Sequence, residues 1–167
     1  MAVGGHDDDC PRVLGVCELR AVIQRALQAS VAVDAEVIGR IERGLVVFLG
    51  VDADDDDKDA AQMAEKVACL RCFEDEAGKI NLSVSDVGGG ILLISQFTVH
   101  GDCRKGRRPS FTQAARPEKA VPLYERVAGL LREKGLAVAT GSFGAHMEVR
   151  VVNDGPVTLL VDTKKAF

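Results

Sequence analysis

The amino-acid sequence predicts an α/β sandwich built around one hydrophobic core. Its 167 residues suffice for one well-packed domain but not for two ordinary ones. Apolar residues make up 47% of the chain and aromatic residues only 4%, so the core is expected to be mostly aliphatic. Several segments alternate apolar and polar residues with the two-residue period of strands, and two longer segments follow the 3.6-residue period of helices. Strands and two helices in this order are typical of an α/β fold.

The first predicted strand covers residues 20–34 and follows a stretch without periodicity. Residues 1–18 mix Gly, Asp, Pro and Cys, and we expect them to form a flexible N-terminal extension before a single domain at 19–167. From Ala21 onward the odd positions of the strand are apolar, with one exception. Arg25 lies on the apolar face, where its guanidinium needs a fixed partner unless the side chain reaches water at a sheet edge.

Two strands and a helix are expected next. Residues 35–42 are predicted to form a second strand, and the apolar run GLVVFLGV at 44–51 indicates a third strand that is covered on both faces. The aspartates of 52–57 provide an N-cap and negative charge for the first turn of a helix. Apolar residues recur at helical spacing from Ala60 to Leu70. The ligand spacing of a calcium loop is missing from the aspartate cluster.

The segment after this helix is predicted to form an exposed hairpin or loop that ends at three glycines. It is followed by ILLISQFTVHG, which is predicted to be a buried strand. Side chains on a strand point alternately to opposite faces, so Gln96, Thr98 and His100 are expected to share one face at its end.

The second helix is predicted over residues 118–134, where leucine and valine recur at helical spacing. Pro117 suits its first turn, whereas Pro122 is expected to delay its start or to kink it. Two strands are predicted to follow, at 145–152 and 157–162. Taken alone, the NDGP between them predicts a plain turn.

The charge of the chain is unevenly distributed. The net charge of -4 argues against indiscriminate binding of nucleic acid, but a local basic patch can still act alone. The densest basic cluster is the loop RKGRR, with Arg104, Lys105, Arg107 and Arg108. Surface solvation is one interpretation of this loop, and contact with phosphates or nucleic acid is the other.

The cysteines and the absence of long apolar runs indicate the compartment. Five cysteines, an odd number, suggest reduced thiols inside the cell. Cys69 and Cys72 form a CxxC pair, but the sequence does not supply the two further ligands that zinc would need. No apolar run approaches the ~18 residues of a membrane span, and MAVGGHDDDC lacks the features of a signal or transit peptide. We therefore expect a cytoplasmic protein without a metal site.

The common catalytic motifs are absent: there is no nucleophile elbow, P-loop or His-Glu-x-x-His pattern. Thr98 could act as a nucleophile only with a base, and Gln96 cannot serve as one. His100 is close in sequence, but a solvated loop histidine is the simpler interpretation of it. We favour hydrogen bonds from Gln96, Thr98 and nearby backbone amides to a carbonyl or its oxyanion. Alone, SQFT at a strand end is equally typical of a structural role.

Taken together and in this order, six segments resemble the D-aminoacyl-tRNA deacylase family, whose members proofread chirality in translation. The segments are RAVIQRALQASV, GLVVFLGV, GKINLSV, SQFT, RKGRRPSF and VNDGPVT. The resemblance extends from about Arg20 to Asp162. It implies a homodimer and a three-layer α/β/β sandwich with a curved, partly barrel-like sheet and two main helices. It also implies that no metal or organic cofactor is required.

The resemblance implies roles for individual residues. Ser95, Gln96, Phe97 and Thr98 match the motif that lines the site of the aminoacyl ester. The basic loop is implied to contact phosphates of the tRNA acceptor stem without reading the base sequence.

Three further groups are implied to bind the substrate. Gly155 and Pro156 match a dipeptide that the family holds with a cis peptide bond and inserts into the site of the partner subunit. Arg25 matches an arginine that helps to hold this dipeptide, which would supply the fixed partner that its burial requires. The last group falls in the segment near the terminal adenosine of tRNA and consists of Phe143, Gly144, Ala145 and Met147.

The implied activity is hydrolysis of the ester bond of D-aminoacyl-tRNA, which releases the free D-amino acid and tRNA. The rigid ring of Pro156 would stand where an L side chain projects, so selection would work by steric exclusion. Glycine has no side chain to exclude, so glycyl-tRNA mischarged on tRNA(Ala) should also enter. Because the ester is already activated, water positioned by the substrate's own 2′-hydroxyl, with the oxyanion held by backbone amides and Thr98, would suffice.

Two alternatives remain at this point. A non-catalytic nucleic-acid-binding domain would use the same basic loop without hydrolysis. A relative of the animal type would clear glycyl-tRNA or mischarged L-alanyl-tRNA, but such relatives differ at the SQFT motif, which is intact in this sequence.

Overall fold

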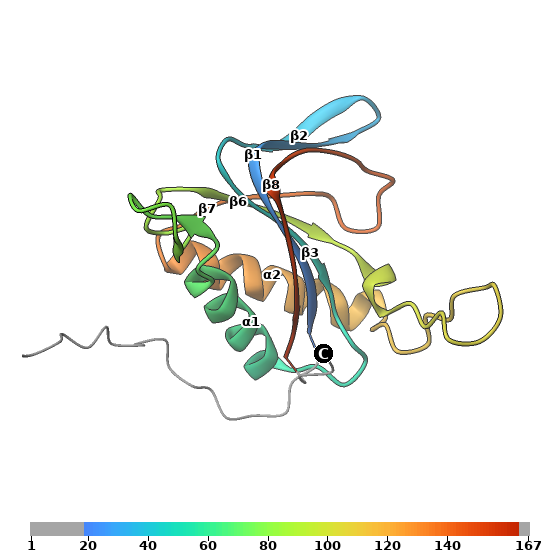
Figure 1. Cartoon of the computed structure of the whole chain (residues 1–167). Helices are drawn as coiled ribbons and strands as arrows, with labels where there is room; N and C mark the ends of the chain where they lie inside the picture. The colour runs from blue at the N-terminus through green and yellow to red at the C-terminus, as the bar shows by residue number, and fades with distance from the viewer. Residues whose placement is uncertain (1–18, 164–167) are drawn as a thin grey trace, which may run out of the picture.

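Strands and two helices follow one another along residues 19–163, which are the residues that the computed structural model describes (Figure 1). The extension expected at 1–18 and the residues at 164–167 lie outside the described residues. The elements are β1 (Arg20–Val33), β2 (Glu36–Ile41), β3 (Gly44–Gly50), α1 (Asp57–Cys69), β4 (Phe73–Glu74), β5 (Ile80–Leu82), β6 (Gly90–Ser95), the 3-10 helix η1 (Phe97–His100), α2 (Pro117–Glu133), β7 (Ala137–Thr140) and β8 (Glu148–Asp162).

The large sheet is organised around β1. One edge of β1 pairs antiparallel with β8 from Arg20 to Ala32. The other edge pairs with β3 as far as Ala26 and with β2 from Ala29 onward, because the strand is long enough for two partners in succession. Beyond β3 the sheet continues with the parallel strands β6 and β7. The result is a strongly curved, barrel-like sheet with both helices on one side of it (Figure 1).

The two faces of β3 and β6 belong to different hydrophobic cores. Leu45 on β3 and Leu93 on β6 belong to the core that contains α1 and α2. Val46 and Leu92 are their neighbours in sequence and belong to a second core with residues of β1 and β2. Helices, central strands and the distal part of β1 with β2 therefore form three layers. The predicted α/β fold class is confirmed.

Helix α1 begins where the aspartate cluster predicts. Asp56 is the N-cap, and its carboxylate accepts hydrogen bonds from the amides of Lys58 and Asp59, at 2.8 and 3.3 Å. The Asp59 carboxylate accepts from the Asp56 amide in return. This capping box satisfies backbone amides that have no partner inside the helix. Asp55 lies just before the cap and is buried, and the loss of water raises its pKa to about 7.

Helix α2 contains two prolines. Pro117 occupies its first turn, where a backbone amide would lack a partner in any case. Pro122 lies inside the helix, but α2 still begins at Pro117 and runs to Glu133, so Pro122 does not delay its start as expected. Neither helix within residues 19–163 is long and apolar enough to cross a membrane.

The alternation of β1 breaks in its middle. Arg25 and Ala26 are both buried, and Leu27 is exposed although its odd position places it on the predicted apolar face. The register against β8 shifts on both sides of Ala26. Such an irregularity changes which side chains face the core. Beyond it the predicted pattern resumes, with Ala29 and Val31 buried.

Two expectations for the C-terminal strands were wrong. Residues 148–162 form the single strand β8, so NDGP is not a plain turn between two strands. Gln24 pairs with Thr158 and Ala26 with Asn153, which leaves residues 154–157 as a bulge between two paired parts of β8. The prediction also missed β7, a four-residue strand that extends the sheet beyond β6.

Candidate active site

A cavity lies at the end of β6, where this strand runs beyond its neighbour β7. The pairing with β7 stops at Leu93 and Thr140, whereas β6 continues to Ser95. On its other edge β6 stays paired with β3 as far as Ser95. Ile94 and Ser95 therefore have a strand on one side only, and both line the cavity.

Gly141 marks the point where the chain leaves the sheet. Its amide donates to the carbonyl of Leu93 at 3.2 Å. A Cβ atom on Gly141 would lie 2.5 Å from the sulfur of Met147 and 3.3 Å from Cδ1 of Ile94. The missing side chain thus allows the following segment to pack closely against the end of β6.

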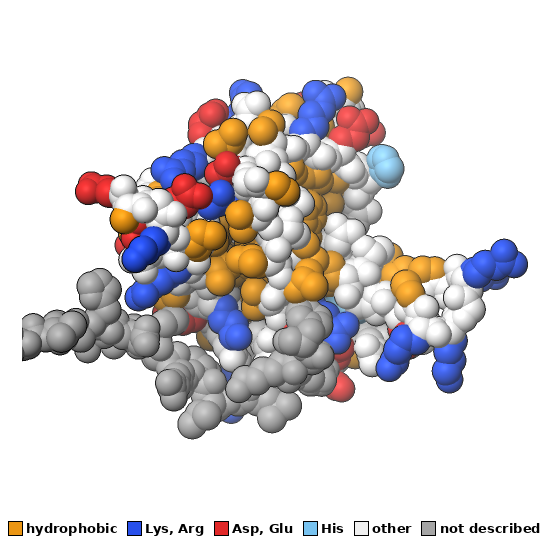
Figure 2. Space-filling model, in the orientation of Figure 1, with side chains coloured by type: hydrophobic (Ala, Val, Ile, Leu, Met, Phe, Trp, Pro, Cys, Tyr) orange, Lys and Arg blue, Asp and Glu red, His pale blue; other side chains and the backbone are white. Residues whose placement is uncertain are grey.

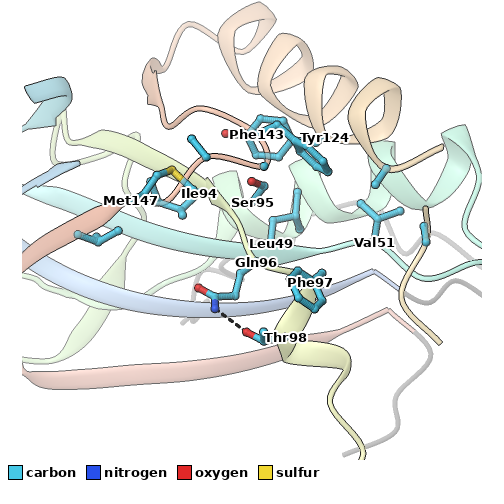
Figure 3. A pocket seen from close by; sticks show the side chains of 15 residues that line it. Leu49, Val51, Ile94, Ser95, Gln96, Phe97, Thr98, Tyr124, Phe143 and Met147 are labelled. Carbon is cyan, nitrogen blue, oxygen red and sulfur yellow. Dashed lines mark hydrogen bonds between the residues drawn. The ribbon is translucent and has the colours of Figure 1, made fainter. Parts of the chain in front are cut away.

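The cavity brings together two of the residue groups that the sequence predicts as site residues. Its volume is about 280 Å³, close to the lower limit for small-molecule sites. One group consists of Ser95, Gln96, Phe97 and Thr98, and the other of Phe143, Gly144, Ala145 and Met147 (Figure 3). The remaining lining residues, which the sequence analysis did not identify, are Leu49, Val51, Ile94, Ala115, Ala120, Tyr124 and Val149.

The SQFT segment is not a continuous strand, which corrects the prediction. The amide of Gln96 still donates to the carbonyl of Leu49, but Phe97–His100 form the 3-10 helix η1. Gln96, Thr98 and His100 therefore do not share a strand face. The turn instead lets Nε2 of Gln96 donate to Oγ1 of Thr98 at 2.5 Å, at the cavity wall (Figure 3).

His100 is not the solvated loop histidine that the sequence suggests. It exposes 1% of its surface, and its Nδ1 lies 3.8 Å from Oδ2 of Asp52. Its ring also packs against Gly50, where a Cβ atom would lie 2.8 Å from Cδ2. His100 does not line the cavity. It is therefore not placed to remove a proton from Thr98.

We expect His100 to make folding less favourable in acid. Burial lowers its pKa below the usual value of 6.5, although Gly50 and Asp52 oppose this shift. Between the lowered pKa and 6.5 the unfolded chain binds a proton that the folded protein does not, so stability falls as the pH falls through this window. The slope is at most about 1.4 kcal/mol per pH unit. Urea unfolding at several pH values should show that the stability of the native chain relative to His100→Gln falls as the pH falls through this window.

Asp55 contributes with the opposite sign, so the effect of His100 is measured as the difference between the native chain and His100→Gln. Its pKa is raised to about 7, mainly by burial, so its contribution is full at low pH and is lost as the pH rises toward 7. The difference between the native chain and His100→Gln cancels this contribution, because both proteins contain Asp55. A pH-independent difference would contradict the assignment to His100.

Tyr124 connects α2 to the cavity wall. Its hydroxyl donates to the carbonyl of Leu93 at 2.7 Å, and its ring meets that of Phe143 edge to face at 6.2 Å. Burial raises the pKa of Tyr124 to about 12, so it stays protonated. The hydroxyl fixes the position of α2 against β6. Its helical spacing predicts only a core residue, so the sequence analysis did not identify it as a residue of the cavity.

Gly155 and Pro156 lie in the bulge of β8, and the peptide bond between them is cis. Both residues are exposed, and neither lines the cavity of its own protomer. The structure therefore does not bring them together with the SQFT segment within one chain.

Arg25 has the fixed partners that its burial requires. Its Nε lies 3.0 Å from Oδ2 of Asp154, and its Nη1 donates to the carbonyl of Cys72 at 2.8 Å. A Cβ atom on Gly155 would lie 3.1 Å from Nη2 of Arg25. The guanidinium thus joins β1, the segment between α1 and β4, and the bulge of β8, and it lies directly beside the Gly155-Pro156 dipeptide.

The basic loop projects from the body of the protein, and Figure 2 shows Lys and Arg side chains on this projection. Arg104 makes two hydrogen bonds to the carboxylate of Asp102, at 2.7 and 2.9 Å, and they hold the pKa of Asp102 well below its usual range. Lys105, Arg107 and Arg108 are exposed and form no ion pair within residues 19–163. Three of the four predicted phosphate ligands therefore have no carboxylate partner in the described part of the chain.

The CxxC pair has no sign of metal or redox chemistry in the described residues. Neither Cys69 nor Cys72 forms a disulfide within residues 19–163. The Sγ of Cys69 donates to Oε1 of Glu65 at 3.1 Å, and burial raises the pKa of the Cys72 thiol. Residues 19–163 contain no group of three or more His, Cys, Asp or Glu side chains that could hold a metal ion.

Comparison with known proteins gives a consistent picture. The family model described as D-Tyr-tRNA(Tyr) deacylase matches residues 22–162. A D-aminoacyl-tRNA deacylase of Thermotoga petrophila is 58% identical over 149 residues, which is 89% of this chain and 100% of that protein. One of Thermus aquaticus is 57% identical over 88% of this chain and 97% of its own. A solved structure named "c-Myc DNA Unwinding Element Binding Protein" is 41% identical with a TM-score of 0.80, over 85% of this chain and 97% of that one.

Proposed function

The chain belongs to the D-Tyr-tRNA(Tyr) deacylase family, and we propose from that premise that it hydrolyses the ester bond of D-aminoacyl-tRNA. The products are the free D-amino acid and tRNA. The observation that carries this proposal is the shared cavity at the end of β6, where Ser95–Thr98 face the segment from Phe143 to Met147. Its volume and mixed lining suit an aminoacyl group whose ester reaches the polar wall.

The proposed chemistry depends on hydrogen bonding rather than on a side-chain base. Oγ1 of Thr98 accepts from Gln96, so its own proton remains available for the ester carbonyl. As water attacks, negative charge develops on that oxygen, and a donor fixed in advance stabilises it. The substrate's 2′-hydroxyl would position the water. As the water oxygen bonds to the carbonyl carbon, one of the water's protons would pass to the ribose oxygen of the ester, which leaves as a hydroxyl group. The step needs neither a metal nor an organic cofactor.

The test is hydrolysis of D-tyrosyl-tRNA and L-tyrosyl-tRNA by the purified full-length chain. We expect rapid release of D-tyrosine and little release of L-tyrosine, with glycyl-tRNA(Ala) also cleaved. Equal rates for both enantiomers, or none, would remove the proposal. A second candidate function is that of a non-catalytic nucleic-acid-binding domain, because one similar structure is named for DNA binding. Binding of tRNA without hydrolysis would favour it.

We propose that the protein acts as a homodimer in which Gly155 and Pro156 reach the cavity of the partner subunit. The dipeptide is exposed, and it does not line the cavity of its own chain. Large apolar side chains are exposed on the same strand before and after it, with Val152 exposing 44% and Leu160 60% of their surfaces. A second copy would cover this apolar surface. The main-chain carbonyls of the dipeptide would then hold the substrate's α-amino group, and the proline ring would exclude an L side chain.

We expect Leu160→Asp to weaken the dimer. A charge at the centre of an apolar interface costs at least about 2 kcal/mol, which raises the dissociation constant about 30-fold or more. Sedimentation should show a dimer for the native chain and dissociation of that dimer in Leu160→Asp. The variant should lose deacylation at the concentrations at which it dissociates. Ile80→Asp is the matched control, because Ile80 is equally exposed at 58% but lies on the β5 hairpin. An unchanged Leu160→Asp dimer, or a monomeric native chain, would contradict this assignment.

The basic loop is proposed to hold acceptor-stem phosphates, and this makes a separate prediction. Replacing Lys105, Arg107 and Arg108 by alanine should raise KM for every aminoacyl-tRNA tested, with little change in kcat. The dependence of log KM on log salt should become shallower by about 2 to 3, because each lost phosphate contact removes about 0.7 to 0.9. Arg126→Ala, an exposed change on α2, is the control for loss of charge alone. An unchanged salt slope would show that the loop does not bind phosphates.

Aminoacyl-tRNA is used in the cytoplasm, which is the compartment we propose for this protein. We further propose that residues 19–167 act as one deacylase domain, with all of the elements above contributing to a single site.

A further inference from the structure

Two exposed phenylalanine rings lie in contact beside the cavity. Phe97 exposes 56% and Phe111 37% of its surface, although apolar side chains of this size are usually buried. Their centroids are 5.2 Å apart, and their planes meet at 75°, which is an edge-to-face arrangement. Phe97 lines the cavity (Figure 3), whereas Phe111 is not among the residues that line it. The pair thus extends the cavity wall outward onto the protein surface.

The backbone fixes the position of the pair. Phe97 begins η1, and Phe111 follows directly after Ser110, which pairs with Asp102 at the neck of the basic loop. The ring of Phe111 also packs against Gly101, where a Cβ atom would lie 2.9 Å from Cε1 of Phe111. Both rings are therefore held in place before any ligand binds, which reduces the entropy lost on binding.

Charge indicates what this aromatic surface binds. The loop that starts and ends at its edge carries Lys105, Arg107 and Arg108, which are exposed and free of ion pairs within residues 19–163. Exposed aromatic rings beside cations are typical of surfaces that bind single-stranded nucleic acid, because bases stack on the rings and phosphates meet the charges. Three adjacent cations attract a polyanion such as RNA more strongly than they attract a second copy of this chain.

We propose that Phe97 and Phe111 form a stacking platform for an unpaired nucleotide of the tRNA 3′ end, the one that precedes the terminal adenosine. This inference rests on the proposed function. The aminoacyl ester lies in the cavity and the duplex lies at the basic loop, so the single-stranded nucleotides between them must cross the surface that carries the two rings. Stacking needs no particular base, so the platform accepts any nucleotide at that place.

The first experiment compares two substrates in the Phe111→Leu variant. With D-tyrosyl-tRNA we expect kcat/KM to fall about 5- to 150-fold, the effect of removing one base stack. With D-tyrosyl-adenosine, which lacks the preceding nucleotide, it should stay within about twofold of the native value, and Phe111→Tyr should behave as the native chain with both. An equal loss with both substrates, or with neither, would overturn the platform. A native chain that cleaves neither substrate would instead refute the proposed function.

The second experiment reads binding directly. The sequence contains no tryptophan, so Phe111→Trp introduces a single indole whose fluorescence reports stacking. Titration with the trinucleotide CCA should quench it, and adenosine alone should quench it much less. No quenching by CCA in an active Phe111→Trp enzyme would overturn the proposal. So would dissociation of the dimer in Phe111→Leu, because it would assign the rings to a contact between subunits.

Discussion

Replacing Thr98 by alanine is expected to lower kcat for D-tyrosyl-tRNA by about 100- to 1000-fold, the range found when one donor to an oxyanion is lost. The Thr98 hydroxyl accepts from Gln96 and lines the cavity, so its proton can point to the ester carbonyl. The charge on that oxygen grows toward the transition state, so kcat should fall more than KM changes. Single-turnover hydrolysis with excess enzyme measures the effect without product release.

Two further measurements distinguish a donor from a nucleophile at this position. Thr98→Ser keeps the hydroxyl and should keep activity within about tenfold of the native chain, because the donor remains. Acid quench during turnover should trap no tyrosyl ester on the protein. A trapped ester on Thr98, together with complete loss of activity in Thr98→Ala, would show covalent catalysis. His100 offers no base for that route, since it is buried against β3 and outside the cavity.

Replacing Arg25 by methionine is expected to lower the free energy of unfolding by about 3 kcal/mol. The side chain is almost fully buried, and its loss leaves the Asp154 carboxylate and the Cys72 carbonyl without their partner. Breaking one side of a buried ion pair costs about 3 to 5 kcal/mol, and partial exposure of Asp154 places the effect at the low end. Urea unfolding measures it. Deacylation should also fall at temperatures where the variant is folded, because the bulge that carries the dipeptide loses its anchor.

The matched control is Arg150→Met, on β8, where the arginine side chain is 83% exposed. We expect a change below about 0.5 kcal/mol there, because exposed ion pairs contribute little. The double variant Arg25→Met, Asp154→Leu should recover part of the lost stability, since an apolar pair can replace a buried ion pair. It should not recover activity. An Arg25→Met variant as stable as the native chain would contradict the role assigned to this contact.

Local signals in the sequence predicted most of the elements correctly. The capping aspartates and the spacing from Ala60 to Leu70 predicted α1, and the apolar run at 44–51 predicted a strand covered on both faces. These features depend on neighbouring residues only. The sequence predicted that Arg25 needs a fixed partner but could not identify it. Asp154 is far away along the chain and is brought near by the pairing of β1 with β8.

The errors share one physical cause. The apolar run ILLISQFTV contains no glycine or proline that would indicate the end of β6. The change to a 3-10 helix at Phe97 therefore does not alter the spacing of apolar residues from which the strand was predicted. The exposure predicted for His100 was wrong for the same reason, because its burial depends on its contacts with Gly50 and Asp52. Strand β7 is short and covers only part of β6. Each feature depends on contacts between distant segments, which periodicity does not report.

The early end of β7 has a consequence for how this protein could lose its activity. The cavity exists because β7 pairs with β6 only as far as Thr140 and leaves Ile94 and Ser95 without a strand partner on that edge. An insertion that prolonged β7 would add backbone hydrogen bonds to β6 and would fill the cavity with backbone at the same time. Such a molecule would have a more regular sheet and no activity. An insertion that completes the sheet at this edge is therefore more harmful to the proposed activity than one that loosens it.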